Sequence, residues 1–415
     1  MRILVLDGNE NQAVACVRSL GRAGHEVTVG APAGWSKAGW SRFGRGTFVY
    51  PAPSDDADAF VACIAAEAAR ERGTLVLPMT ESTTLPLSQY RATVEAAGGR
   101  LVLPPHETLL RAFDKQHTTM LAASLGVDVP QTTVVSSSAD VREQAATLCY
   151  PVVVKPRTSQ EYVGGRSVRT TGAPTYARDA RELLAAWANI AQRCRAALVQ
   201  EFVEGEGVGY FALMRHGDVR AEFAHRRLRD VRPTGSGSSL RESVAPDPRV
   251  REAAQAILRA LEWHGVAMVE FRTRRDGTPV FLEVNGRFWH SLALAVHAGV
   301  DFPALLARLA VDDDVAPVFT YQHGVRCRWL LGDLRHLAEV WRGRPVGYPG
   351  RFPSRLATLA AILTPVRGTY HDNFSVSDPL PELGDWFDFL LRKIPQARRT
   401  ATAKVWNAKG RPSHS

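Results

Sequence analysis

The chain has 415 residues, 45% of them hydrophobic, which is ample for packed cores and, at the usual domain size, for about two or three domains. No apolar run approaches the roughly 18 residues that a membrane helix needs, and the opening residues MRILVLDGNENQ have neither the basic nor the apolar region of a secretory signal. The net charge of +9 is compatible with a nucleic-acid partner, but no nucleic-acid-binding motif is present and much of the excess lies in the final residues, so nucleic-acid binding is not expected.

Residues 1 to about 110 alternate between strand and helix patterns. Strand runs and helical runs follow one another at 3–6, 12–22, 26–29, 58–72 and 74–78. This alternation predicts a parallel sheet, and ligands of such sheets bind beyond the carboxyl ends of the strands. Thr80 and Glu81 follow the last of these strands and are candidates for a substrate pocket, with an ordinary turn or helix cap as the alternative. A lone Gly8 is no GxGxxG fingerprint, so no nicotinamide or flavin cofactor is expected.

Lysine is rare in this chain, and its positions are therefore informative. Six of the 51 basic residues are Lys, and between Trp40 and Leu390 only Lys115 and Lys155 remain. An ammonium group is a compact point charge and a guanidinium is a planar fork, so a phosphate pocket of fixed size can require Lys. Lys115 is expected in the first turn of a helix, where backbone N–H groups already attract anions, and Lys155 ends the strand predicted at 151–155. Chance placement is the alternative.

A predicted strand pair gathers polar side chains suited to a metal. Two β-prone runs are separated by a hairpin turn signal, at 266–271, Asp276–Gly277 and 280–284. Because side chains alternate along a strand, Glu283, Asn285 and Arg287 share one face, and Glu270 lies on the partner strand. Two carboxylates and an amide oxygen suit Mg²⁺, and a neighbouring cation can hold an anion that the metal also touches. A solvated edge or a buried salt bridge is the alternative.

Two other segments are candidates for substrate contacts. Clustered arginines beside a Gly/Ser stretch at 235–239 suit an anionic ligand that becomes covered on binding, and Arg226 and Arg241 are the candidates there. A solvated basic face is the competing interpretation. The aromatic and basic segment at 35–45 is either a substrate loop or a packed surface loop.

The rest of the sequence carries no catalytic constellation. Residues 318–395 look mainly helical, with a Gly/Pro-rich break at 343–353. The stretch 396–415 has five cations and no acid, which predicts a disordered tail, with contact to anionic lipid as the alternative. The five cysteines are scattered and never form a CxxC pair, which favours a reducing cytoplasm and disfavours structural zinc.

Taken in order, these elements resemble the ATP-grasp superfamily, and most closely its carboxylate–amine ligase-like members, with likeness also to biotin carboxylase and to carbamoyl phosphate synthase. The matching elements are Lys115 opening a helix, VVVK ending at Lys155, the loop with Gly164–Gly165, VQEFVEGE at 199–206, VEF at 269–271 and FLEVNGR at 281–287. The resemblance implies a mixed α/β and α+β architecture. Its expected parts are a parallel α/β pre-ATP-grasp domain at 1–104, a two-lobed ATP-grasp domain at 105–317 with a lid at about 150–210, a small mainly helical C-terminal region at 318–395, and a basic tail at 396–415.

The same resemblance implies a nucleotide site. Lys115 and Lys155 would contact the phosphates of ATP. The hinge residues would pair with adenine mainly through their backbone, and they are Glu201, Phe202 and Val203. Glu206 would hold the ribose hydroxyls, although Glu204 is close enough to compete.

It also implies a catalytic centre. Glu270, Glu283 and Asn285 would bind Mg²⁺ (or Mn²⁺), and Arg287 would act with Lys155 to steady the transferring phosphoryl group and the acyl phosphate. Two features depart from the relatives: the phosphate loop has fewer glycines than that of biotin carboxylase, and neither a Met-Lys-Met biotinyl site nor a glutaminase segment is present.

The resulting hypothesis is an ATP-dependent ligase that joins a small-molecule carboxylate to an amine through an acyl phosphate, releasing ADP and phosphate. One alternative is an enzyme that phosphorylates bicarbonate, of the carboxylase or carbamoyl phosphate type. Another is a regulatory ATP-binding protein without catalysis, and a third is nucleic-acid binding through the basic tail. Association into a homo-oligomer is compatible with the sequence.

Overall fold

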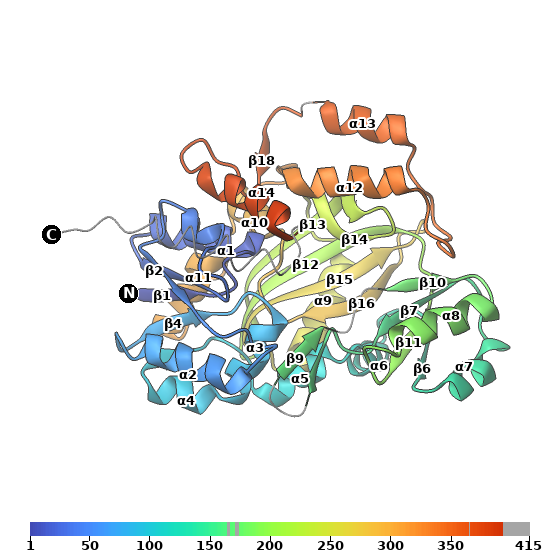
Figure 1. Ribbon diagram of the computed structural model, residues 1–415, viewed down its shortest axis with the longest axis horizontal. Coiled ribbons are helices and arrows are strands. Elements are labelled where there is room, and N and C mark those ends of the chain that lie inside the picture. Colours follow the sequence, from blue (N-terminus) through green and yellow to red (C-terminus); the bar gives the residue numbers. More distant parts are fainter. Residues whose placement is uncertain (164–166, 171–173, 365, 393–415) are drawn as a thin grey trace.

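The computed structural model describes residues 1–163, 167–170, 174–364 and 366–392. Within these ranges the chain forms three parts, which Figure 1 shows with an N-terminal sheet on one side, a small lobe on the other and a large sheet between them. The predicted loop glycines Gly164 and Gly165, and the predicted tail at 396–415, lie outside the described residues.

The N-terminal part is a five-stranded parallel sheet in the order β3-β2-β1-β4-β5. Its strands are β1 (Arg2–Val5), β2 (Glu26–Ala31), β3 (Gly46–Val49), β4 (Thr74–Leu77) and β5 (Gly99–Arg100). Its helices are α1 (Asn11–Arg22), α2 (Ala57–Ala68), α3 (Glu81–Gln89) and α4 (Arg91–Ala96), with a short 3-10 turn at Ala38–Trp40. The central strand β1 is buried on both faces, as strands between two layers of helices must be. The predicted parallel sheet is confirmed.

The small lobe, residues 132–201, is built on a four-stranded antiparallel sheet in the order β10-β7-β11-β6. The strands of this sheet and the two helices that cover it are β6 (Thr132–Val135), α7 (Ser138–Ala145), β7 (Val152–Pro156), β10 (Thr175–Ala177), α8 (Ala180–Ile190) and β11 (Ala197–Glu201). A separate hairpin joins β8 (Gln160–Val163) to β9 (Ser167–Thr170). The lobe therefore begins with β6, ahead of the lid start expected near residue 150.

The large sheet has seven strands in the order β16-β15-β12-β13-β14-β17-β18. They are β12 (Glu206–Arg215), β13 (Asp218–Arg232), β14 (Ser236–Ser243), β15 (Gly265–Thr273), β16 (Pro279–Asn285), β17 (Arg326–Arg328) and β18 (Thr369–His371). The surrounding helices are α5 (His106–Phe113), α6 (Lys115–Ser124), α9 (Pro248–Ala260), α10 (Leu292–Ala298) and α11 (Phe302–Asp312). Most of the Gly/Ser stretch at 235–239 pairs with β13 as β14, because cross-strand hydrogen bonds outweigh the weak strand preference of Gly.

The C-terminal region is mainly helical, as expected, with α12 (Leu330–Arg342), α13 (Arg355–Leu363) and α14 (Leu380–Arg392). It also supplies β17 and β18 to the large sheet, and α14 packs on the N-terminal part (Figure 1). Buried ion pairs at 2.9 Å join Lys37 to Asp385 and Arg18 to Asp378.

The segment at 35–45 packs against this last helix. The rings of Trp35 and Trp40 lie 4.9 and 5.6 Å from the ring of Phe387, between centroids. The packed-loop interpretation of this segment therefore describes its structure. Within the described ranges no single helix is long and apolar enough to span a membrane, although α10 and α11, bent by 88° at their junction, meet the length and composition criteria as a pair.

Candidate functional site

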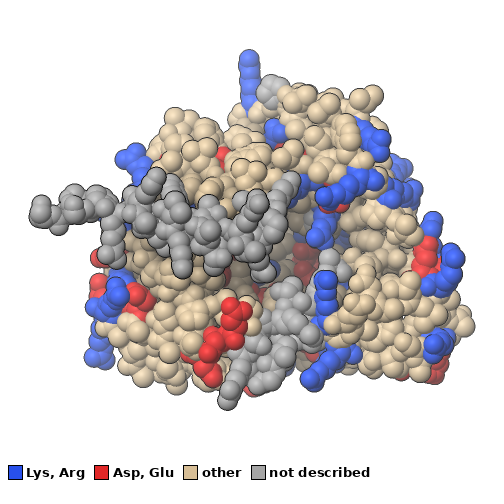
Figure 2. Space-filling model, in the orientation of Figure 1, with Lys and Arg blue, Asp and Glu red and all other residues tan. Residues whose placement is uncertain are grey.

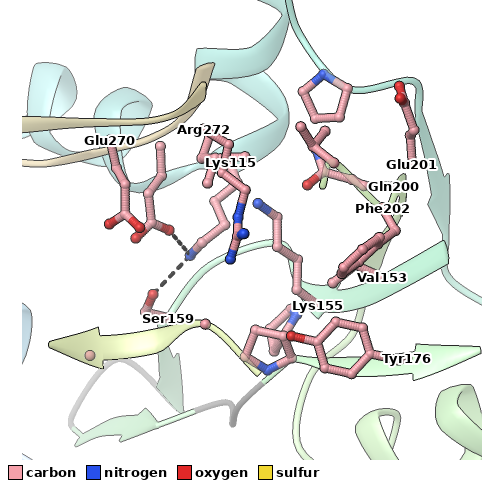
Figure 3. A pocket seen from close by; sticks show the side chains of 18 of the residues that line it. Lys115, Val153, Lys155, Ser159, Tyr176, Gln200, Glu201, Phe202, Glu270 and Arg272 are labelled. Atoms are coloured by element: carbon pink, nitrogen blue, oxygen red, sulfur yellow. Dashed lines mark hydrogen bonds and ion pairs between the residues drawn. The ribbon is translucent and has the colours of Figure 1, made fainter. Parts of the chain in front are cut away.

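A cavity of about 290 Å³ opens between the small lobe and the large sheet. On the face drawn in Figure 2, basic side chains gather along the edge of the hollow between these two parts. The lining residues come from β7 and β11 on one side and from β13, β15 and β16 on the other. Figure 3 shows the ammonium groups of Lys115 and Lys155 pointing into this pocket.

Lys115 reaches the pocket from the first turn of α6. The carboxylate of Asp114 caps this helix by accepting from the backbone N–H groups of Gln116 and His117, and it also binds the guanidinium of Arg157. The Lys115 ammonium donates to Ser159 Oγ at 2.8 Å, and it lies 3.7 Å from the nearer carboxylate oxygen of Glu283. A helix N-terminus and a fixed cation thus face the same space, an arrangement that attracts anions.

Lys155 lies on β7 and is buried. Burial lowers the pKa of its ammonium group to about 8, and the nearby charge of Lys115 adds to that effect, while the carboxylates of Glu283 and Glu270 oppose it. An anion bound in the pocket would raise this pKa again, because opposite charges favour the protonated form.

The two predicted metal-binding carboxylates lie side by side. Glu270 and Glu283 are direct partners in the antiparallel pairing of β15 with β16. Burial alone would raise the pKa of Glu283, but Lys115 and Lys155 hold it below its usual value. The amide nitrogen of Asn285 lies 3.3 Å from a carboxylate oxygen of Glu283.

This donor set fits Mg²⁺. Among the described residues no cluster of three or more His, Cys, Asp or Glu side chains is arranged to hold a metal. Mg²⁺ is commonly held by one or two carboxylates together with phosphate oxygens and water, so Glu270 and Glu283 are sufficient as protein ligands. Asn285 joins them if its amide turns its oxygen toward the pair, since the two amide ends are nearly interchangeable in shape.

Two arginines of the pocket were missed by the sequence-based predictions. Arg227 binds Glu270 at 2.6 Å and is largely buried, and Arg272 donates to the carbonyl oxygen of Gly205 at 2.9 Å. Arg226, the predicted candidate, is the neighbour of Arg227 on β13, so it points to the opposite face, where it binds Glu242 at 2.7 Å. Alternation along β13 is the signal that could have separated Arg226 from Arg227.

Arg241 does not line the pocket. It is fully buried, and both ends of its guanidinium bind the carboxylate of Asp372 at 2.8 to 3.0 Å. Its remaining N–H donates to Ser238 Oγ at 3.0 Å. The Arg241 side chain therefore binds β14 to the residues after β18. The structure does not bring it to a substrate.

The predicted hinge lines the pocket at the end of β11, through Glu201, Phe202 and Val203. The backbone N–H of Glu201 donates to Gln131, and that of Phe202 donates to Pro151. Among the described residues the backbone N–H of Val203 has no such acceptor, so it is available to a ligand.

The two carboxylates predicted to hold a ribose lie outside this pocket. Glu204 is exposed and pairs with Arg275 at 3.2 Å, and Glu206 is exposed at the start of β12. Between them, Gly205 approaches β15 so closely that a Cβ atom would lie 2.2 Å from the carbonyl oxygen of Thr273.

Arg287 connects the Asn285 side of the pocket to the N-terminal sheet. Its guanidinium donates to the amide oxygen of Asn285 at 3.2 Å and lies 3.9 Å from the carboxylate of Glu81. Burial raises the pKa of Glu81, and Arg287 partly offsets that rise. The hydroxyl of Thr80 donates to the buried carboxylate of Asp7 at 3.1 Å. The carboxyl end of β4 therefore meets Arg287, as a substrate-binding edge would.

Comparison with known proteins gives a family match and several relatives. A family model described as "ATP-grasp in the biosynthetic pathway with Ter operon" matches residues 193–332. A D-alanine–D-alanine ligase of Nitrosospira multiformis is 27% identical over 216 residues, which cover 48% of this chain and 66% of that ligase. The chain thus spans slightly less than two thirds of the length of this relative.

Solved structures share the fold. The biotin carboxylase domain of Hydrogenobacter thermophilus 2-oxoglutarate carboxylase, solved with MgADP and bicarbonate, aligns with a TM-score of 0.61 at 14% identity, covering 78% of this chain and 73% of that one. An L-amino acid ligase of Bacillus licheniformis aligns with a TM-score of 0.58 at 17% identity, covering 75% and 74%. The chain is therefore similar to ATP-grasp proteins in residues 193–332, and it shares its fold with these two solved structures.

Proposed function

We propose that this protein is an ATP-dependent carboxylate–amine ligase that forms an amide through an acyl phosphate. The observation that carries the proposal is that Lys115 and Lys155 share one pocket with the paired carboxylates of Glu270 and Glu283 and face them there. Such an arrangement neutralises and positions phosphates, which is what phosphoryl transfer requires. The likeness to a D-alanine–D-alanine ligase and an L-amino acid ligase supports this class of reaction.

In the proposed binding mode, the adenine contacts the hinge at Glu201, Phe202 and Val203, and the phosphates extend toward the two lysines. Glu270 and Glu283 hold Mg²⁺, with Asn285 as the third candidate ligand. The metal, when bound, neutralises charge on the phosphate oxygens. Arg227, paired with Glu270, fixes the orientation of that carboxylate.

The reaction then follows from the position of Arg287. An oxygen of the substrate carboxylate attacks the γ-phosphorus, the bond between the β- and γ-phosphates breaks, and ADP leaves. Arg287 steadies the acyl phosphate beside Glu81 and Thr80, the predicted substrate residues. An amine attacks the acyl carbon, the C–O bond to phosphate breaks, and the nitrogen loses a proton. The chain provides positioning and charge without a protein nucleophile.

The direct test is ADP release from purified protein across panels of carboxylic acids, with hydroxylamine added to trap an acyl phosphate as a hydroxamate. Hydroxamate that depends on one organic acid and on ATP supports the ligase. ADP release stimulated by bicarbonate alone would replace the proposal with a bicarbonate-phosphorylating enzyme. ATP binding without ADP release in any mixture would indicate a regulatory protein.

We also infer a cytoplasmic location from the thiol chemistry. None of the five cysteines forms a disulfide, and three of them, Cys16, Cys194 and Cys327, are buried. Alkylation of the cell extract in denaturant without reductant tests this location, since a protein from an oxidising compartment would show blocked thiols.

A further inference from the structure

Three aromatic side chains from distant parts of the chain meet beside the pocket. They are Tyr176 on β10, Phe202 directly after β11, and Tyr348 in the connection between α12 and α13, and we call them the aromatic triad. The ring centroid of Tyr348 lies 5.0 Å from that of Tyr176 and 5.9 Å from that of Phe202, and the remaining pair is 6.0 Å apart. All three pairs are edge-to-face, the arrangement that the quadrupoles of aromatic rings favour.

The triad has an inner and an outer part. Tyr176 and Phe202 line the pocket, and Figure 3 shows both rings in its wall. Tyr348 does not line it and is only 7% exposed. The C-terminal region therefore stands behind the pocket wall and contacts both of its aromatic side chains.

Hydrogen bonds tie the triad to the turn between β13 and β14. The hydroxyl of Tyr176 donates to the carbonyl oxygen of Thr234 at 2.8 Å, and that of Tyr348 donates to the carbonyl oxygen of Pro233 at 3.4 Å. Burial raises the pKa of both tyrosines, so their hydroxyls stay protonated and keep donating. Gly235, one residue beyond this turn contact, lines the pocket. The triad thus joins the small lobe to the large sheet.

The loop that carries Tyr348 is shaped for this contact. Arg344 donates to the carbonyl oxygens of Tyr348 and Pro349 at 2.9 and 3.0 Å. Gly347 has a φ of +77°, and a Cβ atom there would lie 2.6 Å from the carbonyl oxygen of Tyr176. A Cβ atom on Gly350 would lie 2.5 Å from Tyr348 Oη. Glycine is therefore required at position 347 for the loop to approach the small lobe this closely.

We propose that Tyr348 is a positioning residue for the nucleotide: it holds Phe202 and Tyr176 in place as the wall that the nucleobase contacts. A wall already fixed before binding loses less side-chain entropy when the base docks. The inference rests on the proposed function, because it takes the ligand of the pocket to be a nucleotide. It gives the C-terminal region a role in nucleotide affinity, although Tyr348 lies outside every ATP-grasp motif in the sequence.

The test measures binding of ADP with Mg²⁺ by isothermal titration calorimetry in four variants and the wild type. Tyr348→Ala and Tyr348→Leu remove the edge-to-face contacts and are expected to weaken ADP binding about tenfold. Tyr348→Phe keeps the ring and is expected to restore most of the affinity. Tyr370→Ala is the matched control, since Tyr370 belongs to the same region but stacks on His297 at 4.0 Å, away from the pocket.

Steady-state kinetics separates positioning from general damage. The Ala and Leu variants are expected to raise KM for ATP while kcat and the KM of the organic acid stay near the wild-type values. Leu fills much of the space of the ring, so the Tyr348→Leu variant supplies the affinity and KM measurements if the Ala variant does not fold. Wild-type affinity in a folded Ala or Leu variant, or a loss of kcat without a change in KM for ATP, would overturn this inference alone. A wild-type protein that binds no ADP would overturn the proposed function, and this inference with it.

Discussion

The ammonium of Lys115 lies 3.7 Å from the carboxylate of Glu283 and donates to the hydroxyl of Ser159 at 2.8 Å. One side chain on α6 therefore touches the large sheet through Glu283 and the small lobe through Ser159. Because the pocket lies between these two parts, the charge of Glu283 controls both the proposed metal position and the placement of a cation for phosphate.

Removing that charge is the sharpest test of the metal assignment. Glu283→Gln keeps the size of the side chain but leaves Lys115 and Lys155 without their nearest shared carboxylate. We expect turnover to fall by a factor on the order of a hundred or more, with loss of the Mg²⁺ dependence of ADP binding and little change in thermal stability. Glu204→Gln is the control, because Glu204 is exposed outside the pocket. Normal turnover in folded Glu283→Gln protein would end the metal assignment.

Nucleotide affinity should depend on pH through Lys155. Its pKa is lowered to about 8, so the ammonium form, which binds phosphate, disappears as pH rises through that value. The Kd for ADP is expected to increase between about pH 7 and about pH 9, with uptake of a proton on binding at the upper end. Calorimetry in buffers of different ionisation enthalpy measures both effects. Lys155→Met should bind more weakly with a flatter profile, and an unchanged profile in this variant would assign the titration to another group.

Arg287 should matter for chemistry more than for nucleotide binding. It does not line the pocket but contacts Asn285 and approaches Glu81. Arg287→Ala is expected to reduce kcat by about a hundredfold to a thousandfold, the usual effect of deleting a donor to a developing charge, while the Kd of ADP changes little. The control is Arg275→Ala, whose side chain is 71% exposed. A large rise in the Kd of ADP with normal kcat would move Arg287 to the nucleotide.

Arg241 should prove to be a stability residue. Its guanidinium and the carboxylate of Asp372 are both completely buried. Arg241→Ala leaves a buried carboxylate without its partner, which costs about 3–5 kcal/mol of the free energy of unfolding. Urea unfolding measures the loss. If a folded variant keeps wild-type stability and instead shows a much higher KM for the organic acid, the earlier assignment of Arg241 to the substrate would be reinstated.

Local patterns in the sequence predicted much of the pocket. Alternation along 280–287 placed Glu283 on the same face as Asn285, and the structure sets Glu283 opposite Glu270 on the neighbouring strand. The scarcity of lysine singled out Lys115 and Lys155, both of which line the cavity. Both signals can be read from one sequence without knowledge of the tertiary fold.

Longer-range contacts were not predictable in the same way. Arg227 enters the pocket because β13 lies two strands from β15, an order that no local pattern fixes. The burial of Arg241 depends on Asp372, 131 residues away. The strand pairing of 326–328 with 369–371 and the packing of Tyr348 on the small lobe likewise depend on the tertiary fold.

The ion pair between Lys37 and Asp385 has a consequence for how the chain matures. The two residues are 348 positions apart, yet their side chains form an ion pair in the interior. During synthesis the first sheet leaves the ribosome long before α14 is made. The ammonium group of Lys37 therefore stays hydrated and without Asp385 until residues 380–392 have been synthesised. The N-terminal sheet therefore completes its packing only late in synthesis. A chain that stops before α14 would expose the apolar surface at Trp35 and Trp40 to quality-control proteases.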